Sequence, residues 1–291
     1  MNGERVLITG GGGQLGSDLA GLLSGRNEVL AAPHAALDVT DDDSAAAAIA
    51  TFEPTLVVNC AAFHNVEVCE REEDRAFEVN ARAVKRLARR CDDAGARLVH
   101  LSTNYVFDGT AEEPYDEGAL PNPRSVYAIS KLAGEHAALA YAPGALVVRT
   151  AGLYGLHGSA SKGGNFVTRM LKRALTDEFL TVVADQRLTP TSTADLAGAI
   201  ADAADRRMSG VLHLTNAGET SWHGFTQAIM ELAAIEVEVR RAVTVRAPGA
   251  ADRPLNGVLR SRAAPPLRPW RDALAEHMDR AGLSALAVHD G

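Results

Sequence analysis

The segment "RVLITGGGGQLGSDLAGLL" (residues 5–23) decides the fold class of this 291-residue chain. It opens with a short, continuously apolar run, which is typical of a strand buried on both faces of a parallel sheet. Four glycines follow, and beyond them leucines recur with helical spacing at Leu15, Leu19, Leu22 and Leu23. A strand, a tight glycine turn and a helix in this order predict the start of a βαβ unit.

The glycines of this turn have a chemical reading. Glycine permits a tight turn and lets backbone N–H groups and the helix N-terminus approach a pyrophosphate. Four consecutive glycines could also be a loose loop, but the strand–turn–helix context favours dinucleotide binding. Gly10, Gly13 and Gly16 stand at the junction, and we predict that Gly10, Gly13, Gln14 and Leu15 contact the cofactor.

The same rhythm continues to about residue 152. Apolar runs recur at "EVLAA" (28–32), "TLVVNCAA" (55–62), "ARLVHLST" (96–103) and "ALVVRTAG" (145–152). Helical patterns separate them, and one carries the apolar stripe Phe77, Val84, Leu87 and Cys91. Strands that alternate with helices imply right-handed crossovers, so we predict an α/β fold with a doubly wound, Rossmann-type parallel sheet. Ligands bind such sheets at the carboxyl ends of the strands.

Beyond residue 152 the rhythm changes, with shorter strand-like runs and a Pro-rich stretch before a last helix near Trp270. The run "GVLHLTN" (210–216) is still typical of a buried strand. We therefore predict a dinucleotide-binding domain at 1–155, to which 190–217 returns. Residues 156–291 are expected to form most of a smaller, discontinuous C-terminal substrate-binding part over the strand ends.

Composition narrows the function classes. The formal net charge of −8 provides no basic surface for nucleic acid. Cys60, Cys69 and Cys91 lack metal-type spacing and are odd in number, as expected of reduced thiols in a cytosolic protein. No charged-then-apolar leader opens the chain, and no apolar run approaches the ~20 residues that cross a bilayer. We expect a cytoplasmic protein without a nucleic-acid, membrane or metal partner.

The end of the second strand bears on the choice of cofactor. An acidic residue about 20 residues beyond the glycine loop normally holds the ribose 2′-OH of NAD, but "AAPHAAL" (31–37) contains none. No Arg or Lys stands there for the 2′-phosphate of NADP, and His34 is the only candidate. Asp38 and Val39 could meet the adenine, or they could belong to a helix N-cap region. We predict NADPH, with NADH tolerated.

Tyr127 and Lys131 in "SVYAISKLAGEHA" (125–137) lie four residues apart near the start of a predicted helix. Their side chains therefore leave the same helical face, one above the other. This pair could be a surface contact, or a proton donor with a lowered pKa.

At this point the motifs resemble those of the extended short-chain dehydrogenases/reductases, and most closely the dTDP-4-dehydrorhamnose reductase family of sugar-nucleotide 4-ketoreductases. The resemblance covers most of the chain, and it is highly specific for the superfamily but only moderately specific for the substrate. It rests on ordered motifs, which are "TGGGGQLG" (9–16), "NCAA" (59–62), "EVNARAV" (78–84), "STNYVFDG" (102–109), "YAISK" (127–131), "VVRTAGLYG" (147–155), "GGNFVTRML" (163–171), "VVADQRLTPTSTADLA" (182–197) and "DRPLNGVL" (252–259).

The resemblance implies three catalytic residues, namely Thr103, Tyr127 and Lys131. A free phenol, with a pKa of ~10, exchanges protons poorly near neutrality. Lys131 and the oxidised nicotinamide are expected to lower the pKa of Tyr127, and Lys131 to hold the nicotinamide ribose. Thr103 is expected to donate a hydrogen bond to the substrate carbonyl, and Tyr127 to deliver the proton.

The resemblance also implies contacts around this centre. Cys60, Ala61 and Ala62 of "NCAA" are expected at the cofactor. Thr103, Tyr127, Asn104, His64, Asn165 and Arg253 are expected at the substrate, Arg253 through bidentate hydrogen bonds to a phosphate.

Three further polar residues keep structural alternatives. His64 could be structural or solvated rather than a sugar contact. Asn80 could help carry protons or fix backbone, or be an ordinary polar helix residue, and Arg149 is read as a structural ion-pair partner rather than a ligand contact.

Some positions depart from the family pattern, which usually has Asp where this chain has Asn104, and often Trp where it has Gly152 and "AAYT" where it has Phe63–His64. An amide changes which hydroxyls can be contacted, and a glycine removes an aromatic platform. We therefore expect a sugar pocket that is more open at Gly152. A homodimer is compatible with the sequence, but no matching acidic set can be placed for a bridging metal ion.

Three functions remain on these grounds. The first is NADPH-dependent reduction of the 4-keto group of a nucleotide-activated deoxysugar, of the dTDP-4-dehydrorhamnose type. A nucleotide-sugar epimerase of similar fold would instead retain its cofactor. A non-catalytic, NADP-binding regulatory subunit shares the fold and keeps similar motifs.

Overall fold

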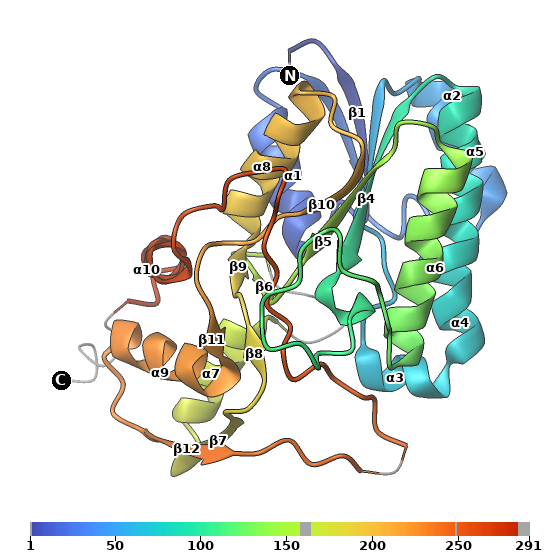
Figure 1. The fold of residues 1–291 in the computed structure, drawn as a ribbon. Coiled ribbons are helices and arrows are strands. Elements are labelled where there is room, and N and C mark those ends of the chain that lie inside the picture. The colour runs from blue at the N-terminus through green and yellow to red at the C-terminus, as the bar shows by residue number, and fades with distance from the viewer. Residues whose placement is uncertain (1, 158–163, 248, 285–291) are drawn as a thin grey trace.

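The computed structural model describes residues 2–157, 164–247 and 249–284 (Figure 1). Of the predicted C-terminal part, residues 158–163, 248 and 285–291 lie outside the described residues. The centre is a six-stranded sheet in the order β10–β5–β4–β3–β1–β2, and each neighbouring pair is parallel. The predicted doubly wound parallel sheet is confirmed. Its strands are β1 (Arg5–Thr9), β2 (Glu28–Ala32), β3 (Leu56–Asn59), β4 (Arg97–Thr103), β5 (Leu146–Thr150) and β10 (Gly210–His213).

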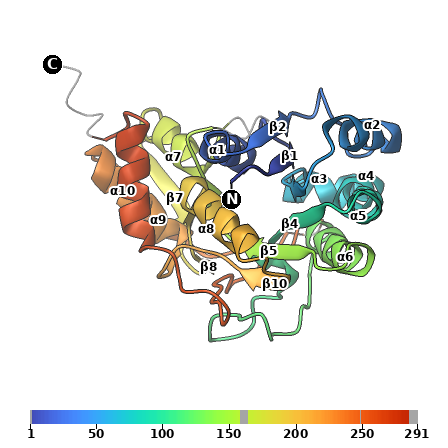
Figure 2. The ribbon, with the colours of Figure 1, turned by 90° about the horizontal axis from the view of Figure 1, so that it is seen from above.

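Alternate residues of each central strand pack against opposite helix layers, which explains why these strands are apolar throughout. Val6 and Ile8 belong to a core shared with α1 (Gln14–Leu23) and α8 (Thr193–Asp205). Leu7, between them, belongs to the core on the other face. The helices there are α2 (Asp42–Phe52), α5 (Ala83–Asp93) and α6 (Val126–Tyr141), and Figure 2 shows the two layers.

The strand order changes direction at β1, which has β2 on one side and β3 on the other. Thr9 at the end of β1 pairs in register with Asn59 at the end of β3. The glycine turn and the segment after β3 therefore meet at one edge of the sheet. A switch of this kind is where open α/β sheets bind ligands.

The C-terminal part has a core of its own beside the central sheet (Figure 1). Tyr154, Leu180, Phe225 and Leu274 are among its buried residues. The chain enters this part from the carboxyl end of β5 and returns to the sheet through α8 and β10. Its elements are α7 (Phe166–Ala174), α9 (Trp222–Ala233), α10 (Trp270–Arg280) and the parallel pair β7 (Phe179–Val183) and β12 (Glu238–Ala242).

Short strands connect the two parts. They are β6 (Leu153–Tyr154) with β9 (Thr191–Ser192), and β8 (Arg187–Leu188) with β11 (Thr220–Ser221). Within the described ranges, no helix is long and apolar enough to cross a membrane.

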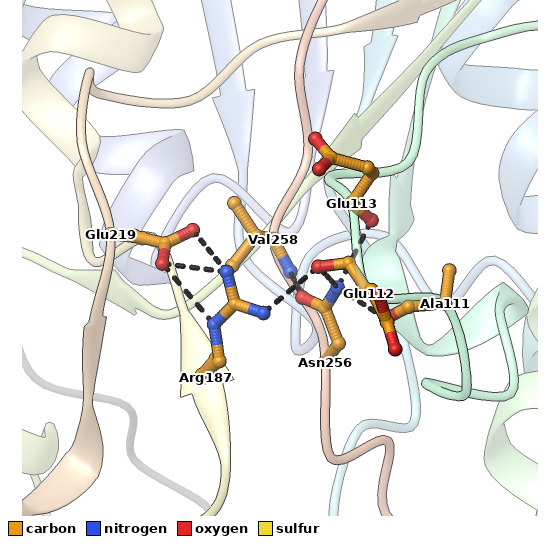
Figure 3. A network of polar contacts seen from close by, with 7 residues as sticks. All are labelled: Ala111, Glu112, Glu113, Arg187, Glu219, Asn256 and Val258. Carbon is orange, nitrogen blue, oxygen red and sulfur yellow. Dashed lines mark hydrogen bonds and ion pairs between the residues drawn. The ribbon is translucent and has the colours of Figure 1, made fainter.

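An ion pair and several hydrogen bonds join the loop after β4 to this region (Figure 3). Arg187 forms an ion pair with Glu219 at 2.6 Å and donates to the carbonyl oxygen of Glu112. The amide of Asn256 donates to the carbonyl oxygens of Ala111 and Glu113. Segments that are more than a hundred residues apart thus lie side by side near the carboxyl end of β4.

Candidate functional site

The glycine turn after β1 packs so closely on the neighbouring strands that side chains are excluded. Gly10 has a φ of +66°, and an added Cβ would lie 2.9 Å from the backbone nitrogen of Ala61. A Cβ on Gly11 would meet the Ala31 backbone, and one on Gly16 the Gly10 carbonyl oxygen. The turn is therefore a cradle of bare backbone, as a pyrophosphate site requires.

The start of α1 completes this cradle. Its N-cap residue, Gly13, provides no side-chain hydrogen bond, so the first N–H groups of the helix keep their capacity to bind an anion. The buried Oε1 of Gln14 has no hydrogen-bond partner among the described residues. Leu15 is buried in the core beneath the turn. An orphaned polar atom and an uncapped helix beside bare backbone fit a dinucleotide cofactor.

The residues after β2 are held in place by hydrogen bonds within their own segment. Asp38 accepts hydrogen bonds from the backbone N–H and the hydroxyl of Thr40, at 2.9 and 2.7 Å. Burial acts to raise the pKa of Asp38, but these hydrogen bonds outweigh it and the pKa is lowered. Val39 is buried, and Asp41 caps α2. The segment thus forms the N-cap region of α2, which was one of the two predicted alternatives, and this role is compatible with an adenine contact.

The segment after β3 is held across the sheet edge by a buried amide. Asn59 Oδ1 accepts from the Thr9 hydroxyl at 2.6 Å and from the Ala61 N–H at 3.2 Å. Cys60, Ala61 and Ala62 are half-buried beside the glycine turn. Burial raises the pKa of the Cys60 thiol to about 12, so this thiol is neutral.

The structure brings Thr103 and Tyr127 together. Thr103 ends β4, and Tyr127 lies in the first turn of α6, whose N-cap Ser125 accepts from the Ala128 N–H. The Thr103 hydroxyl lies close enough to the Tyr127 phenol to act on its pKa. Burial raises the pKa of Tyr127, although Thr103 acts to lower it, so the phenol stays protonated at neutral pH.

Lys131 lies one turn further along α6 and is buried. Its Nζ donates to the Leu101 carbonyl oxygen at 2.5 Å. Burial lowers the pKa of Lys131 to about 8, although Glu135 and Cys60 act to raise it. This corrects our expectation for Tyr127, because among the protein's own groups burial outweighs any stabilisation of the phenolate. A protonated phenol is nevertheless the form that a proton donor requires.

Asn80 lies in a π-helical turn, η1 (Glu78–Arg82), which continues into α5. Its amide accepts from the Phe63 N–H and donates to the Phe63 carbonyl oxygen, both at 2.9 Å, and donates to Ser130 Oγ at 3.0 Å. A Cβ on Gly134 would collide with the Asn80 carbonyl oxygen. Of the alternatives for Asn80, the structure therefore supports fixing backbone, between the segment after β3 and α6.

Arg149 takes the structural role favoured by the sequence. It forms a bidentate ion pair with Glu135, at 2.9 and 2.6 Å, and both side chains are buried. Ser102 donates to the same carboxylate. The pair anchors α6 to β4 and β5 one turn beyond Lys131.

A second group of side chains extends from Tyr127 toward the C-terminal part. The ring of Tyr105 meets that of Tyr127 edge-on, with centroids 5.8 Å apart. Arg253 lies close enough to Tyr105 for the two groups to interact, and it forms an ion pair with Glu67 at 2.9 Å. Arg253 and Glu67 line a pocket of about 280 Å³ together with Val183, Gln186, Thr244, Val245, Arg246, Ala250, Ala251 and Asp252.

The other predicted substrate residues have partners within the protein. Asn104 is buried and donates to the Gly257 carbonyl oxygen at 2.9 Å. His64 is half-buried, with Nδ1 3.3 Å from the Ala62 carbonyl oxygen. Asn165 caps α7 and donates to the Gly155 carbonyl oxygen at 2.7 Å. These bonds place Asn104 and His64 beside Thr103 and the "NCAA" segment, whereas those of Asn165 lie within its own cap and the β6 connection.

The expectation of an open pocket at Gly152 is wrong. Gly152 has a φ of +57°, and an added Cβ would lie 2.9 Å from Leu188 Cδ1 and 3.2 Å from the Thr189 carbonyl oxygen. A side chain here would collide with the segment between β8 and β9. Gly152 is therefore required by backbone conformation and packing.

Sequence reasoning missed Tyr105, although it stands inside the quoted "STNYVFDG" motif. It also missed Glu67, Asn59 and His100. Asn59 likewise stands inside the quoted "NCAA" motif, whereas Glu67 and His100 lie in none of the quoted family motifs.

Thus a dinucleotide cradle and a Thr–Tyr–Lys set meet at the carboxyl ends of parallel strands, an arrangement that defines an extended short-chain dehydrogenase/reductase. The model of the RmlD substrate binding domain family matches residues 4–282. A dTDP-4-keto-6-deoxy-D-glucose reductase from Streptomyces niveus is 40% identical, covering 94% of this chain and 96% of that protein. A dTDP-4-dehydrorhamnose reductase from Mycobacterium tuberculosis is 42% identical, covering 94% and 91%.

Among solved structures, dTDP-4-dehydrorhamnose reductase from Bacillus anthracis in complex with NADP superposes with a TM-score of 0.90. It is 31% identical, and the match covers 96% of this chain and 99% of that one. The chain belongs to the dTDP-4-dehydrorhamnose reductase family, whose members are NAD(P)H-dependent oxidoreductases that act on sugar nucleotides.

Proposed function

We propose that this protein reduces the 4-keto group of a nucleotide-activated deoxysugar, with NADPH as reductant and Tyr127 as proton donor. The observation that carries the proposal is the placement of Thr103 at the end of β4 close to Tyr127 in the first turn of α6, with Lys131 one turn further along. A protonated phenol beside a hydroxyl donor is what a ketone needs as it becomes an alcohol.

The cofactor site is assigned by the chemistry of its donors. Gly10, Gly13 and Gln14 provide bare backbone, a helix N-terminus and an orphaned amide oxygen for the pyrophosphate region. NADPH, when bound, supplies the hydride. The absence of an acid from residues 31–37 removes the usual selector for NAD, so NADPH is favoured and NADH is tolerated.

The protein's own groups manage the proton. The Thr103 hydroxyl donates to the carbonyl oxygen and stabilises the negative charge that develops there. Tyr127 transfers its O–H proton to this oxygen, which becomes the product hydroxyl, and the phenolate that remains is reprotonated from solvent. The Lys131 ammonium favours the phenolate at that moment and holds the ribose.

The substrate approaches from the side of Arg253. The pocket that Arg253 lines adjoins Tyr105, and Tyr105 contacts Tyr127, so a molecule with a sugar at Tyr127 can extend toward the guanidinium. A diphosphate would compete with Glu67 for Arg253, because guanidinium binds phosphate in a bidentate way. Asn104 and His64 are assigned to the sugar, while Asn165 serves as the N-cap of α7.

The test is incubation of the protein with NADPH and a dTDP-4-keto-6-deoxysugar, following NADPH absorbance and identifying the product by NMR. We expect one NADPH oxidised for each alcohol formed. Epimerised sugar without NADPH oxidation would indicate an epimerase, and tight NADPH binding without any turnover would indicate the regulatory subunit.

A further inference from the structure

A line of buried polar side chains connects Thr9, at the end of β1, to Lys131. Thr9, Asn59, His100 and Lys131 are each at most 2% exposed. Asn59 Nδ2 lies 3.0 Å from His100 Nδ1, and His100 Nε2 lies 3.5 Å from Lys131 Nζ. Buried polar groups are costly unless their donors and acceptors match, so the direction of each contact can be worked out.

The orientation of the Asn59 amide is fixed at its oxygen. The Ala61 backbone N–H can only donate, and it lies 3.2 Å from Oδ1. The Thr9 hydroxyl lies 2.6 Å from the same oxygen. A flipped amide would direct its NH₂ group at the Ala61 N–H, so Oδ1 must face Ala61 and Nδ2 must face His100.

This orientation fixes the tautomer of His100. Because Asn59 Nδ2 can only donate, Nδ1 of the ring must accept and carries no proton. Burial, and then the charge of Lys131, lower the pKa of His100 well below its usual value, so the ring is neutral. Its proton is therefore on Nε2, the nitrogen that faces Lys131.

The contact between His100 and Lys131 consequently pairs two donors. An ammonium has no acceptor, and Nε2–H offers none to it. The bond to the Leu101 carbonyl oxygen remains as the protein acceptor that orients Nζ. A neutral amine, in contrast, could accept from Nε2–H.

The remaining groups around Lys131 compensate its charge only in part. From the segment after β3 comes the neutral Cys60 thiol, and from its own helix the protonated Tyr127. Glu135, one turn along α6, is the nearest carboxylate that acts on Lys131, but it already forms a bidentate ion pair with Arg149 of β5.

We infer that Asn59 and His100 are positioning residues for Lys131: the Asn59 amide holds the imidazole as its Nε2–H tautomer, which presents a donor instead of an acceptor to the lysine. Burial lowers the pKa of Lys131 to about 8, and a donor beside Nζ acts in the same direction because it disfavours the charged form. The charge is present below that pH and is lost as pH rises through it. If the proposed function holds, kcat/KM falls over the same range, because the charge favours the phenolate of Tyr127.

The tautomer is measured directly, without substrate, on the full chain carrying isotope-labelled histidine. The ring nitrogen shifts of His100, assigned by the loss of its signals in His100→Gln, should report an unprotonated Nδ1 and a protonated Nε2. A proton on Nδ1, or a charged ring at neutral pH, overturns the inference. This result stands whether or not the protein reduces a sugar, so the two proposals fail separately.

The coupling to Lys131 is tested with Asn59→Asp. A carboxylate still accepts from Ala61 and Thr9, but it presents an acceptor to His100, so the ring proton should move to Nδ1 and Nε2 should accept from Lys131. The chain has four lysines, so Lys131 can be followed by NMR with isotope-labelled lysine. We expect its titration, and the basic limb of kcat/KM, to move upward by about one pH unit or more.

The matched control is Thr9→Val, which removes the other hydrogen bond to Asn59 Oδ1 but keeps the Ala61 N–H. It should leave the His100 tautomer and the Lys131 titration as in the wild type. Two results with Asn59→Asp contradict the inference: an unmoved Lys131 titration, or a moved titration with the His100 tautomer unchanged, since added charge alone would then explain it. If Asn59→Asp does not fold, the wild-type tautomer decides.

Discussion

The cofactor side and the substrate side of the site are built in different ways. At the glycine turn, backbone groups form the site. Gly10, Gly11 and Gly16 leave no room for a Cβ, and Gly13 leaves the start of α1 uncapped. On the substrate side, side chains form the site, since Arg253 contacts Glu67 and Tyr105, which are distant from it in the sequence. A backbone site is local in sequence and tolerates little change, whereas a side-chain site depends on how distant segments are brought together.

We expect the largest effect, a loss of turnover, at Tyr127, which lies between the cofactor side and the substrate side. Tyr127→Phe removes one oxygen and keeps the ring, so turnover should drop by about 10²–10⁴-fold while NADPH affinity is retained. Steady-state kinetics and a NADPH titration measure both quantities. Tyr141→Phe is the matched control, because Tyr141 lies on the same helix with its ring against Lys85 and Arg89. A Tyr127→Phe enzyme with most of its activity would contradict the assignment of the proton donor.

The backbone character of the cofactor side is tested by Gly10→Ala. The new Cβ meets the Ala61 backbone at a positive φ, and strain of this kind costs about 1–3 kcal/mol. We expect NADPH affinity to fall by about tenfold or more, measured by calorimetry. Gly21→Ala adds the same methyl group in α1 where nothing lies within 4 Å, and it should leave binding unchanged. Equal behaviour of the two variants would show that the turn does not approach the cofactor.

The side-chain character of the substrate side is tested by Arg253→Lys. Lysine keeps the charge but loses the planar bidentate contact, so the KM for the nucleotide sugar should rise by about tenfold with NADPH affinity unchanged. Arg240→Lys, in a surface ion pair with Glu238, provides the control. A rise in the Kd for NADPH with no change in the KM for the sugar would place Arg253 at the cofactor instead of at the substrate.

The smallest effect concerns cofactor choice. Because residues 33–37, directly after β2, include no acid, titrations with NADH and NADPH should give Kd values within about tenfold of each other, or ~1.4 kcal/mol. A thousandfold preference for NADH would show that the 2′-OH is held by a group that we have not identified.

The features that the sequence predicts correctly are those that depend on local signals. The strand, glycine turn and helix of residues 5–23 are local signals, and the structure has them as β1, the turn and α1. Thr103, Tyr127 and Lys131 were predicted from the resemblance of their motifs, and the structure has them at the end of β4 and on α6, while their catalytic roles stay predictions.

The rest depends on contacts between distant residues. Asn59 and His100 are 41 positions apart, and no local pattern predicts that their side chains meet. Gly152 was misread because neither its positive φ nor the approach of Leu188 can be seen in sequence. Likewise, the pKa of Tyr127 follows from burial by the folded chain, which the spacing to Lys131 does not reveal.

The central claim is that a hydride reaches the 4-keto carbon of a nucleotide sugar and that Tyr127 provides the proton. The most direct test uses NADPH that carries deuterium at the transferred position, with a dTDP-4-keto-6-deoxysugar, and NMR of the product. We expect one deuterium at C4 of the sugar for each NADPH oxidised, and almost none within the same time for Tyr127→Phe. A product without deuterium at C4, or equal labelling by the variant, would contradict it.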